Sequence, residues 1–187
     1  TIEVKGAATL TAQGHGKALA CQTFTATGTV KASTDYQPET PVDYVADNLG
    51  SYKYVKVTHA VVKYNVWVGG TQVTSANMNN VLNDATATVK YTPADEETAQ
   101  KLTLNGANIS ASETTKGIES TSGALDIELI GENKIETDSN SINSSGALTI
   151  TSTKNGSLTM SSKNNMSTLY ATADITISGS AIVNATI

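Results

Sequence analysis

The chain repeats one short pattern four times, at Leu102-Thr-Leu104, Leu125-Asp-Ile127, Leu148-Thr-Ile150 and Ile175-Thr-Ile177. The first two steps are 23 residues each (125 − 102 and 148 − 125), and the third is 27 (175 − 148). A glycine follows each triplet, at Gly106, Gly131, Gly156 and Gly179. Repeats of this length, with strand-type alternation and small polar turns, are typical of a stacked solenoid.

Further apolar points follow within each repeat. The second lies at Ile109, Ile135, Leu158 and Ile182, and the third at Ile118, Ile142 and Leu169. Side chains alternate along a strand, so the residue between each apolar pair should face outward. The predicted inner rows are Leu102, Leu125, Leu148, Ile175 and Leu104, Ile127, Ile150, Ile177. The predicted outer row is Thr103, Asp126, Thr149, Thr176.

Composition narrows the classes of protein that fit this repeat. Of the 187 residues, 39% are hydrophobic and only 16% are charged, so Thr, Ser, Asn and Gly must cover most of the surface. That composition suits strands with polar turns and argues against a helical protein. The net charge is −5, and all 12 basic residues are lysines. Arginine is the usual side chain for bidentate recognition of phosphate and bases, so we expect no nucleic-acid partner.

The composition also bears on where the protein works. Cys21 is the single cysteine, so neither an intrachain disulfide nor a thiolate metal site is expected. No apolar run approaches the length of a membrane span, and we expect no membrane insertion. Abundant Thr, Ser and Asn favour an extracellular or cell-surface protein.

The aromatic residues divide the chain near residue 100, because only Tyr170 lies after it. Large side chains predict an aromatic-rich β domain with a conventional core in the first part. Within it, Tyr64–Val68 and Thr71–Thr74 are typical of a hairpin, since Gly69-Gly70 supplies the positive φ angles of a two-residue turn. We therefore expect an all-β fold with a right-handed parallel β-helix of about four rungs. The predicted segments are 1–22, a rung-like strand segment; 23–100, the β domain; and 101–187, the β-helix.

The two ends of the chain carry matching patterns. Thr1–Gly6 copies the opening of a rung, and Ala181–Ile187 stops midway through one. An uncapped solenoid end exposes apolar side chains and unpaired backbone groups, which invites pairing. The predicted subunit interface consists of Ile2, Val4 and Leu10 against Ile175, Ile177, Ile182 and Val183.

Three arrangements satisfy this match. The N-terminal segment folds back within one molecule, or it stacks on the next molecule to give a head-to-tail filament, or the chain is one unit of a tandem array. The alternative is that the pair Ile2 and Val4 belongs to an ordinary strand of the N-terminal part.

The motifs Tyr64–Asn77, Lys101–Ile109 and Gly123–Ile135 together resemble bacterial surface proteins with right-handed parallel β-helix repeats. Such proteins are often labelled carbohydrate-binding domain-containing, after a pectin-binding, calcium-containing relative. The resemblance covers roughly residues 60–187 and implies a secreted, adhesin-like module. In that family, segments like Thr1–Tyr54 follow the rungs, so this chain looks permuted.

Parallel β-helices include pectin-cleaving enzymes, so catalysis has to be weighed. The lyases among them use calcium and a basic side chain, commonly arginine, and this chain has none. Its solenoid lysines fall at different rung positions, at Lys116, Lys134, Lys154 and Lys163. The hydrolases need neighbouring carboxylates on one face. Asp126 and Glu128 share one strand, with Glu132 and Glu136 beyond the turn, and adjacent rungs add no more. We expect no enzyme activity.

Other candidate ligand sites have simpler structural explanations. Calcium suits turn residues such as Asp138 with Asn140, or the acids Asp95-Glu96-Glu97. Solvated turns are the commoner role for such residues, so we expect no metal site and no required cofactor. His15 and His59 lack a nearby cysteine or carboxylate motif. Trp67 suits a sugar-stacking role, but its place in a hairpin favours a packed core or interface residue.

These observations favour a structural function. We expect a secreted surface module that associates with itself head to tail, as a filament or array subunit. The alternative is a non-catalytic module that binds a polysaccharide, with or without calcium.

Overall fold

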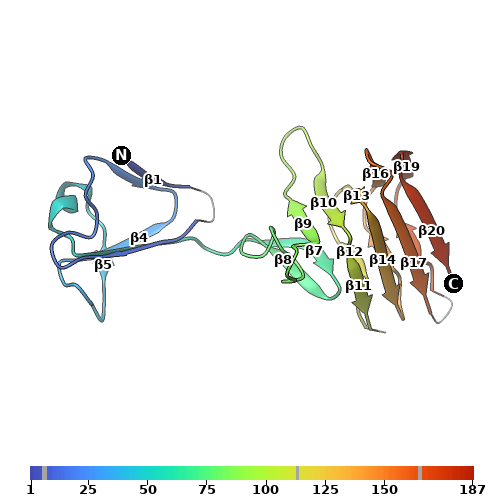
Figure 1. Ribbon diagram of the computed structural model, residues 1–187, viewed down its shortest axis with the longest axis horizontal. Helices are drawn as coiled ribbons and strands as arrows, with labels where there is room; N and C mark the ends of the chain where they lie inside the picture. Colours follow the sequence, from blue (N-terminus) through green and yellow to red (C-terminus); the bar gives the residue numbers. More distant parts are fainter. Residues whose placement is uncertain (6–7, 113, 164–165) are drawn as a thin grey trace. The chain divides into compact units, whose positions relative to one another are not determined.

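The computed structural model describes residues 1–5, 8–112, 114–163 and 166–187. In these ranges the regular secondary structure is nearly all strand, with 48% of the chain in strands and 3% in helix, which confirms the all-β class. The chain divides into two compact units, Thr1–Val61 and Val62–Ile187, whose strands are drawn as arrows in Figure 1. The observed division after residue 61 differs from the boundaries at 22 and 100 that the sequence suggested.

Unit 1, Thr1–Val61, is a small β unit made of two sheets. Its elements are β1 (Ile2–Val4), β2 (Leu10–Gln13), β3 (Phe24–Ala26), β4 (Thr29–Ser33), β5 (Val42–Asp43), a 3-10 helix η1 (Ala46–Ser51) and β6 (Tyr54–Thr58). One sheet pairs β1 with β3 in parallel, and the other has the antiparallel order β2-β6-β4-β5. The buried core consists of Val4, Leu19, Phe24, Ala32, Leu49, Tyr52, Val55 and Val57.

The rung-like segment 1–22 is part of unit 1 in this structure. Val4 and Leu19 are only 8% and 7% exposed, because both pack in the core of that unit. The strands β1 and β2 are nevertheless edge strands. Each has one neighbouring strand among the described residues, β3 and β6 respectively, so each keeps a second edge without a strand partner.

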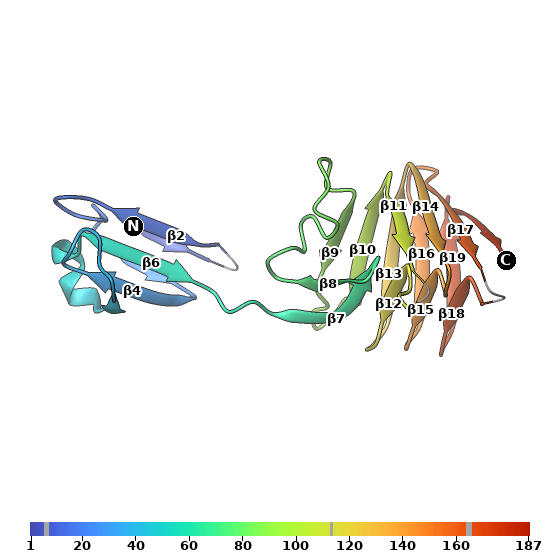
Figure 2. The same cartoon turned by 90° about the horizontal axis from the view of Figure 1, so that it is seen from below.

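Unit 2, Val62–Ile187, is a parallel β-solenoid built from three sheets. Its strands are β7 (Lys63–Val68), β8 (Thr71–Thr74), β9 (Val89–Thr92), β10 (Gln100–Asn105), β11 (Asn108–Ala111), β12 (Ile118–Ser120), β13 (Leu125–Ile130), β14 (Glu132–Thr137), β15 (Ile142–Ser144), β16 (Leu148–Ser152), β17 (Ser157–Ser162), β18 (Leu169–Ala171), β19 (Ile175–Gly179) and β20 (Ile182–Thr186). Sheet 1 has the order β19-β16-β13-β10-β9, sheet 2 the order β11-β14-β17-β20, and sheet 3 the order β18-β15-β12-β7-β8. Figure 2 shows corresponding strands of successive layers side by side.

Parallel ladders join four layers of this solenoid, which begin at β10, β13, β16 and β19. The solenoid as a whole counts about seven turns. The expected number of about four rungs therefore describes the parallel ladders and is too low for the whole solenoid. The inner rows are fully buried in the middle layers, as at Ile127 and Ile150. Stacking each layer on the next removes this apolar surface from water, which stabilises the solenoid by about 25 cal/mol per Å².

The register of the first layer corrects the predicted rows. Leu102 lies beside Ile127, and Gln100 lies beside Leu125. The first layer is thus shifted by two residues from the alignment of the repeated triplets. The outward neighbour of Asp126 is consequently Lys101, and Thr103 lies beside Glu128. In this register Gln100 is buried and hydrogen-bonded to Tyr91, Ser120 and Ser122.

The second sheet corrects the predicted apolar points in the same way. Ile109 does lie beside Ile135, as expected. Leu158, however, lies beside Asn133 and Val183. The fourth predicted point, Ile182, lies beside Ser157 and therefore belongs to an outward row.

The segment that precedes the first rung closes the solenoid. The predicted hairpin is present: β7 and β8 are antiparallel, and Gly69 and Gly70 have φ angles of 54° and 79°. Strand β7 pairs antiparallel with β12, and β9 pairs antiparallel with β10. Antiparallel strands end the parallel ladders of sheets 1 and 3 at this side. Residues 62–99 therefore form a cap of the solenoid, and this is why the division lies at residue 61.

Candidate functional site

The C-terminal end of the solenoid is formed by β18, from the layer that begins at β16, and by β19 and β20 of the last layer. Each of these strands has a parallel partner in the layer below and no partner strand on its other side among the described residues. We call this surface the open end. It presents the backbone N–H and C=O groups that the next rung of a solenoid would pair.

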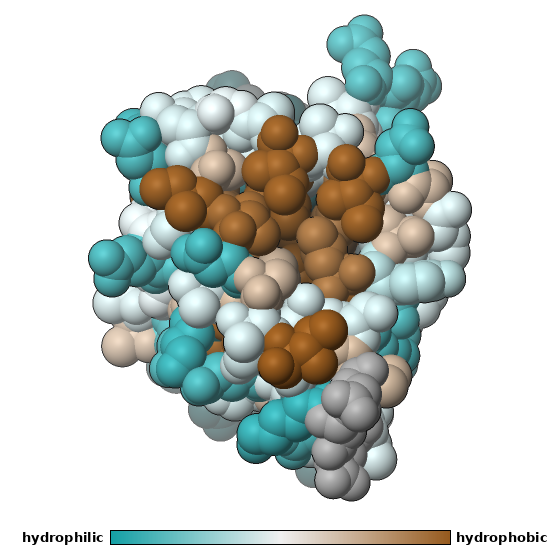
Figure 3. Space-filling model, turned by 90° about the vertical axis from the view of Figure 1, so that its right-hand side faces the viewer, coloured by the Kyte–Doolittle hydropathy of each residue, from teal (hydrophilic) through white to brown (hydrophobic). Residues whose placement is uncertain are grey.

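The open end is also apolar. Ile175 is 44% exposed and Ile177 is 49% exposed, whereas Leu148 and Ile150 in the layer below are fully buried. These isoleucines continue the inner rows of sheet 1, so they are core residues without a covering layer. Figure 3 shows this end of the molecule, with apolar side chains gathered on it. Exposed apolar patches are typical of interaction sites and of surfaces that are prone to aggregation.

Two other predicted interface residues contribute differently to the open end. Val183 is half-buried and packs against the solenoid core, in the inner row that contains Leu158. Ile182 is 53% exposed but faces outward in the row of Ser157. It therefore lies at the side of the open end and not in its core.

The remaining predicted interface residues lie in unit 1. Ile2 and Val4 are on β1, and Leu10 is on β2. All three pack in or against the core of unit 1. Their strands pair with β3 and β6, so the described strand pairing of this segment is internal to unit 1.

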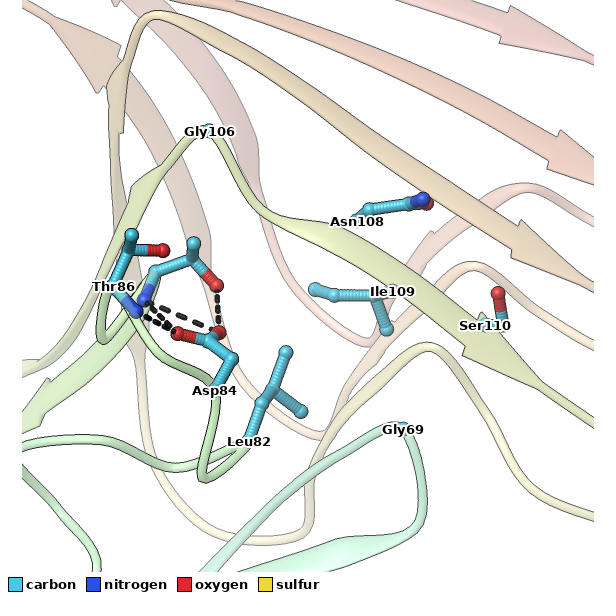
Figure 4. A pocket seen from close by; sticks show the side chains of 9 residues that line it. Gly69, Leu82, Asp84, Thr86, Gly106, Asn108, Ile109 and Ser110 are labelled. Carbon is cyan, nitrogen blue, oxygen red and sulfur yellow. Dashed lines mark hydrogen bonds between the residues drawn. The ribbon is translucent and has the colours of Figure 1, made fainter.

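The opposite end of the solenoid has a depression of about 460 Å³ over β11, lined by residues that include Gly69, Leu82, Asp84 and Ile109. Figure 4 shows that Asp84 turns toward its own loop at this place. Its carboxylate accepts hydrogen bonds from the hydroxyl and N–H of Thr88 and from the N–H of Thr86. The bond from the Thr88 hydroxyl is the main cause that lowers the pKa of Asp84. The carboxylate thus holds the loop together, and we assign no ligand to it.

The two candidate calcium sites contain residues with partners in the protein. Asp138 forms an ion pair with Lys163 at 2.9 Å, and the Asn140 amide donates to Ser167 O at 2.7 Å. Asp95 accepts hydrogen bonds from the Thr98 hydroxyl and from two backbone N–H groups, and these bonds lower its pKa. Within the described ranges, no group of three or more His, Cys, Asp or Glu side chains gathers as a metal site.

The carboxylates that were weighed for catalysis lie on two sheets. Asp126 and Glu128 are on β13 of sheet 1, and Glu132 and Glu136 are on β14 of sheet 2. Glu128 forms an ion pair with Lys101 at 3.2 Å. Of the two histidines, His15 stacks on Tyr36 with ring centroids 4.2 Å apart, and His59 Nε2 lies 3.0 Å from the Thr27 hydroxyl.

Trp67 lies outside the buried core, which was one of the two places that its hairpin position suggested. It lies between the fully buried Val66 and Val68 and is half-buried on the opposite, outward face of β7. The strand register places it in one row across the outer face of sheet 3. We call this the aromatic row: Gln72, Trp67, Glu119, Asn143 and Tyr170. The sequence did not indicate this row, because its members come from five strands and only their pairing aligns them.

No family model, no curated protein and no solved structure matches this chain. The resemblance to β-helix surface proteins therefore rests on the quoted motifs, and the assignment of function rests on the surfaces described above. Among the described residues, no helix is long and apolar enough to cross a membrane.

Proposed function

We propose that this protein is a structural module of the cell surface or extracellular space that assembles head to tail through its open end. The observation that carries the proposal is the last layer of the solenoid, in which Ile175 and Ile177 continue the buried inner rows but are about half exposed. A second copy that covers this layer extends the solenoid core and pairs its free strand edges.

Covering the open end lowers the free energy in two ways. Full burial of an isoleucine side chain contributes roughly 1.5–3 kcal/mol, and about half of that contribution is still available at each half-exposed position. Strand addition also pairs backbone groups at the free strand edges of the open end, which gives affinity that is independent of the outward side chains.

The test compares two lysine substitutions. Ile177→Lys places an ammonium group in the apolar surface, whereas Thr149→Lys places the same group in an outward row one layer below. We expect Ile177→Lys to weaken association about tenfold or more and Thr149→Lys to leave it nearly unchanged. Sedimentation and negative-stain electron microscopy would measure this. Monomers of the unaltered protein at all accessible concentrations would contradict the proposal.

The aromatic row supports a second candidate function, a non-catalytic module that binds an acidic polysaccharide. Trp67 and Tyr170 flank Glu119 and Asn143 in the row. Successive strands lie about 4.8 Å apart, so the two strands that carry the aromatic residues, β7 and β18, are about 14 Å apart along the face. Flat aromatic faces with polar groups between them suit an extended sugar chain, because such rings combine apolar contact area with a polar edge.

Affinity gel electrophoresis in polygalacturonate would test this second function. Binding predicts retardation that is lost in Trp67→Ala and Tyr170→Ala but kept in Tyr36→Ala, which removes an aromatic ring of unit 1 outside the row. Retardation that persists in EDTA would show that calcium is not required. Equal mobility with and without the polysaccharide would contradict the second function.

A further inference from the structure

We infer that the open end of one copy docks on the free edges of β1 and β2 in unit 1 of a second copy. This inference rests on the proposed function, because it names the surface that the open end would meet. In this arrangement β19 adds to β1 and β20 adds to β2, both in parallel. Four features of the sequence and the structure support it.

The first feature is a sequence match without gaps. Residues 2–12 and 175–185 correspond at a constant offset of 173 (175 − 2). The matched pairs are Ile2 with Ile175, Val4 with Ile177, Gly6 with Gly179, Ala8 with Ala181, Leu10 with Val183 and Ala12 with Ala185. Stacked rungs of a solenoid place similar residues beside each other, so the segment 2–12 has the composition of a layer that follows β19 and β20.

The second feature is that no strand has to leave unit 1. Strand β1 is parallel to β3, with Ile2 beside Phe24, and β1 has no partner on its other edge among the described strands. Strand β2 is likewise at the end of its sheet, beside β6 alone. Adding β19 to β1 gives one parallel ladder, β16-β19-β1-β3, whose last pair is already formed within unit 1.

The third feature is the direction of the hydrogen bonds at the open end. Leu148 lies beside Ile175, and its N–H donates to Asp174 O at 2.9 Å. An inward residue of this ladder thus directs its backbone groups to the following layer. Because this direction alternates along a strand, Ile175 and Ile177 direct theirs out of the open end.

The same geometry recurs at β1. Ile2 lies beside Phe24, and its N–H donates to Thr23 O at 2.8 Å. The inward Ile2 therefore directs its backbone groups to the following strand, and the alternate residue Glu3 directs its groups to the free edge. The backbone groups of Glu3 at this edge can therefore pair with those of Ile175 and Ile177 at the edge of β19.

Strands β20 and β2 are complementary by the same criterion. The Ile182 N–H donates to Gly156 O in the layer below at 3.1 Å. The next residue, Val183, therefore directs its backbone groups out of the open end. On β2, Gly14 N–H donates to Lys53 O, next to β6, at 3.0 Å. Alternation then turns the backbone groups of Thr11 to the free edge of β2.

The fourth feature is the pairing of the outward residues. The docked register sets Glu3 beside Thr176, Lys5 beside Ser178 and Thr11 beside Asn184. No two like charges meet in these pairs, and like charges directly opposite each other would weaken the pairing. The outward side chains therefore permit the register that the inward side chains favour.

Disulfide trapping between two differently altered chains tests the register. Both chains carry Cys21→Ser; one also carries Glu3→Cys and the other Thr176→Cys. Neighbouring strands are about 4.8 Å apart, which lies within the Cα–Cα range of a disulfide. We expect the mixture to yield a cross-linked pair of chains on oxidation. The control replaces Thr176→Cys by Thr149→Cys, one layer deeper and about 10 Å from Glu3, and should give none.

A charge exchange gives an independent readout if the cysteine variants fold poorly. Thr176→Glu sets a second carboxylate beside Glu3 and should weaken association about two- to fivefold, and Glu3→Lys in the same chain should restore it. Equal association of all three proteins would overturn the register.

The outcomes separate the inference from the proposed function. Assembly without the cross-link to Thr176→Cys would overturn the inference and leave assembly through the open end intact. A chain that carries both cysteines and cross-links only within itself would overturn docking on a second copy. Absence of any assembly would overturn the proposed function together with the inference.

Discussion

At the scale of single residues, Gln100 explains why the first rung differs from the repeat. It occupies the position that Leu125 fills in the next layer. Its side-chain amide donates to the Ser120 hydroxyl at 2.9 Å and to Ser122 O at 2.7 Å, and it accepts a hydrogen bond from the Tyr91 hydroxyl at 3.0 Å. Burial, with a smaller contribution from Tyr64, raises the pKa of Tyr91 to about 12. The phenol therefore remains a hydrogen-bond donor at neutral pH.

Gln100→Leu should consequently destabilise unit 2, although it restores the residue type of the repeat. The hydroxyls of Tyr91 and Ser120 would lose a buried partner, and a loss of about 1–3 kcal/mol in the free energy of unfolding is expected. Urea denaturation would measure it. Tyr91→Phe removes only one of these bonds and serves as the milder control. A more stable Gln100→Leu protein would show that the network is not what sets the register.

Asp84 gives a prediction for pH. Its folded-state pKa is lowered, first by the Thr88 hydroxyl, from a reference value of 3.8. Its stabilisation of the loop is therefore fully present above that reference value and is lost as the pH falls through the lower folded-state pKa. Hydrogen exchange at the amides of Thr86 and Thr88 should accelerate over this range, relative to the core amides of β13. In Asp84→Asn this additional pH dependence should be absent; its persistence would assign the effect to another group.

At the scale of elements, the cap formed by residues 62–99 covers the first rung of the solenoid. The ladders of sheets 1 and 3 end on antiparallel strands, β9 on β10 and β7 on β12. Val66, Val68, Val73 and Val89 of these strands are fully buried in the same core as the rungs. Without the cap, the first layer would present the same kind of apolar surface and unpaired edge as the open end.

Truncation tests this role of the cap. A chain of residues 62–187 should fold on its own, because it contains the complete core of unit 2. A chain of residues 101–187 should aggregate or remain unfolded, since two of its three sheets would gain an uncovered edge. Circular dichroism and size-exclusion chromatography would distinguish them. A soluble, cooperatively unfolding chain of residues 101–187 would show that the cap is dispensable.

At the scale of the whole molecule, the two units have separate buried clusters, one within Thr1–Val61 and one within Val62–Ile187. Separate cores predict separate unfolding transitions, because each cluster loses its own buried surface when its unit unfolds. Assembly through the open end would then raise the stability of the docked units as the protein concentration increases.

Paired core substitutions test this independence. Val55→Ala in unit 1 should lower the stability of one transition by about 2 kcal/mol. Ile135→Ala in unit 2 should lower the stability of the other by about 2–5 kcal/mol. Differential scanning calorimetry of a dilute sample would assign each transition. A single transition that both substitutions shift equally would show that the two units unfold as one.

The all-β solenoid, the hairpin at Gly69-Gly70 and the match between residues 2–12 and 175–185 could be recognised from the amino-acid sequence. These features depend on alternation and turn residues, which act over a few positions of the chain. Three other features became visible only in the folded chain: the register at Gln100, the outward placement of Ile182 and the inclusion of residues 62–99 in the solenoid. A shift of two residues keeps every side chain on its original face of a strand, so alternation does not distinguish one register from the other. The register is instead set by hydrogen bonds and packing between neighbouring layers, whose residues are about one rung apart in the sequence.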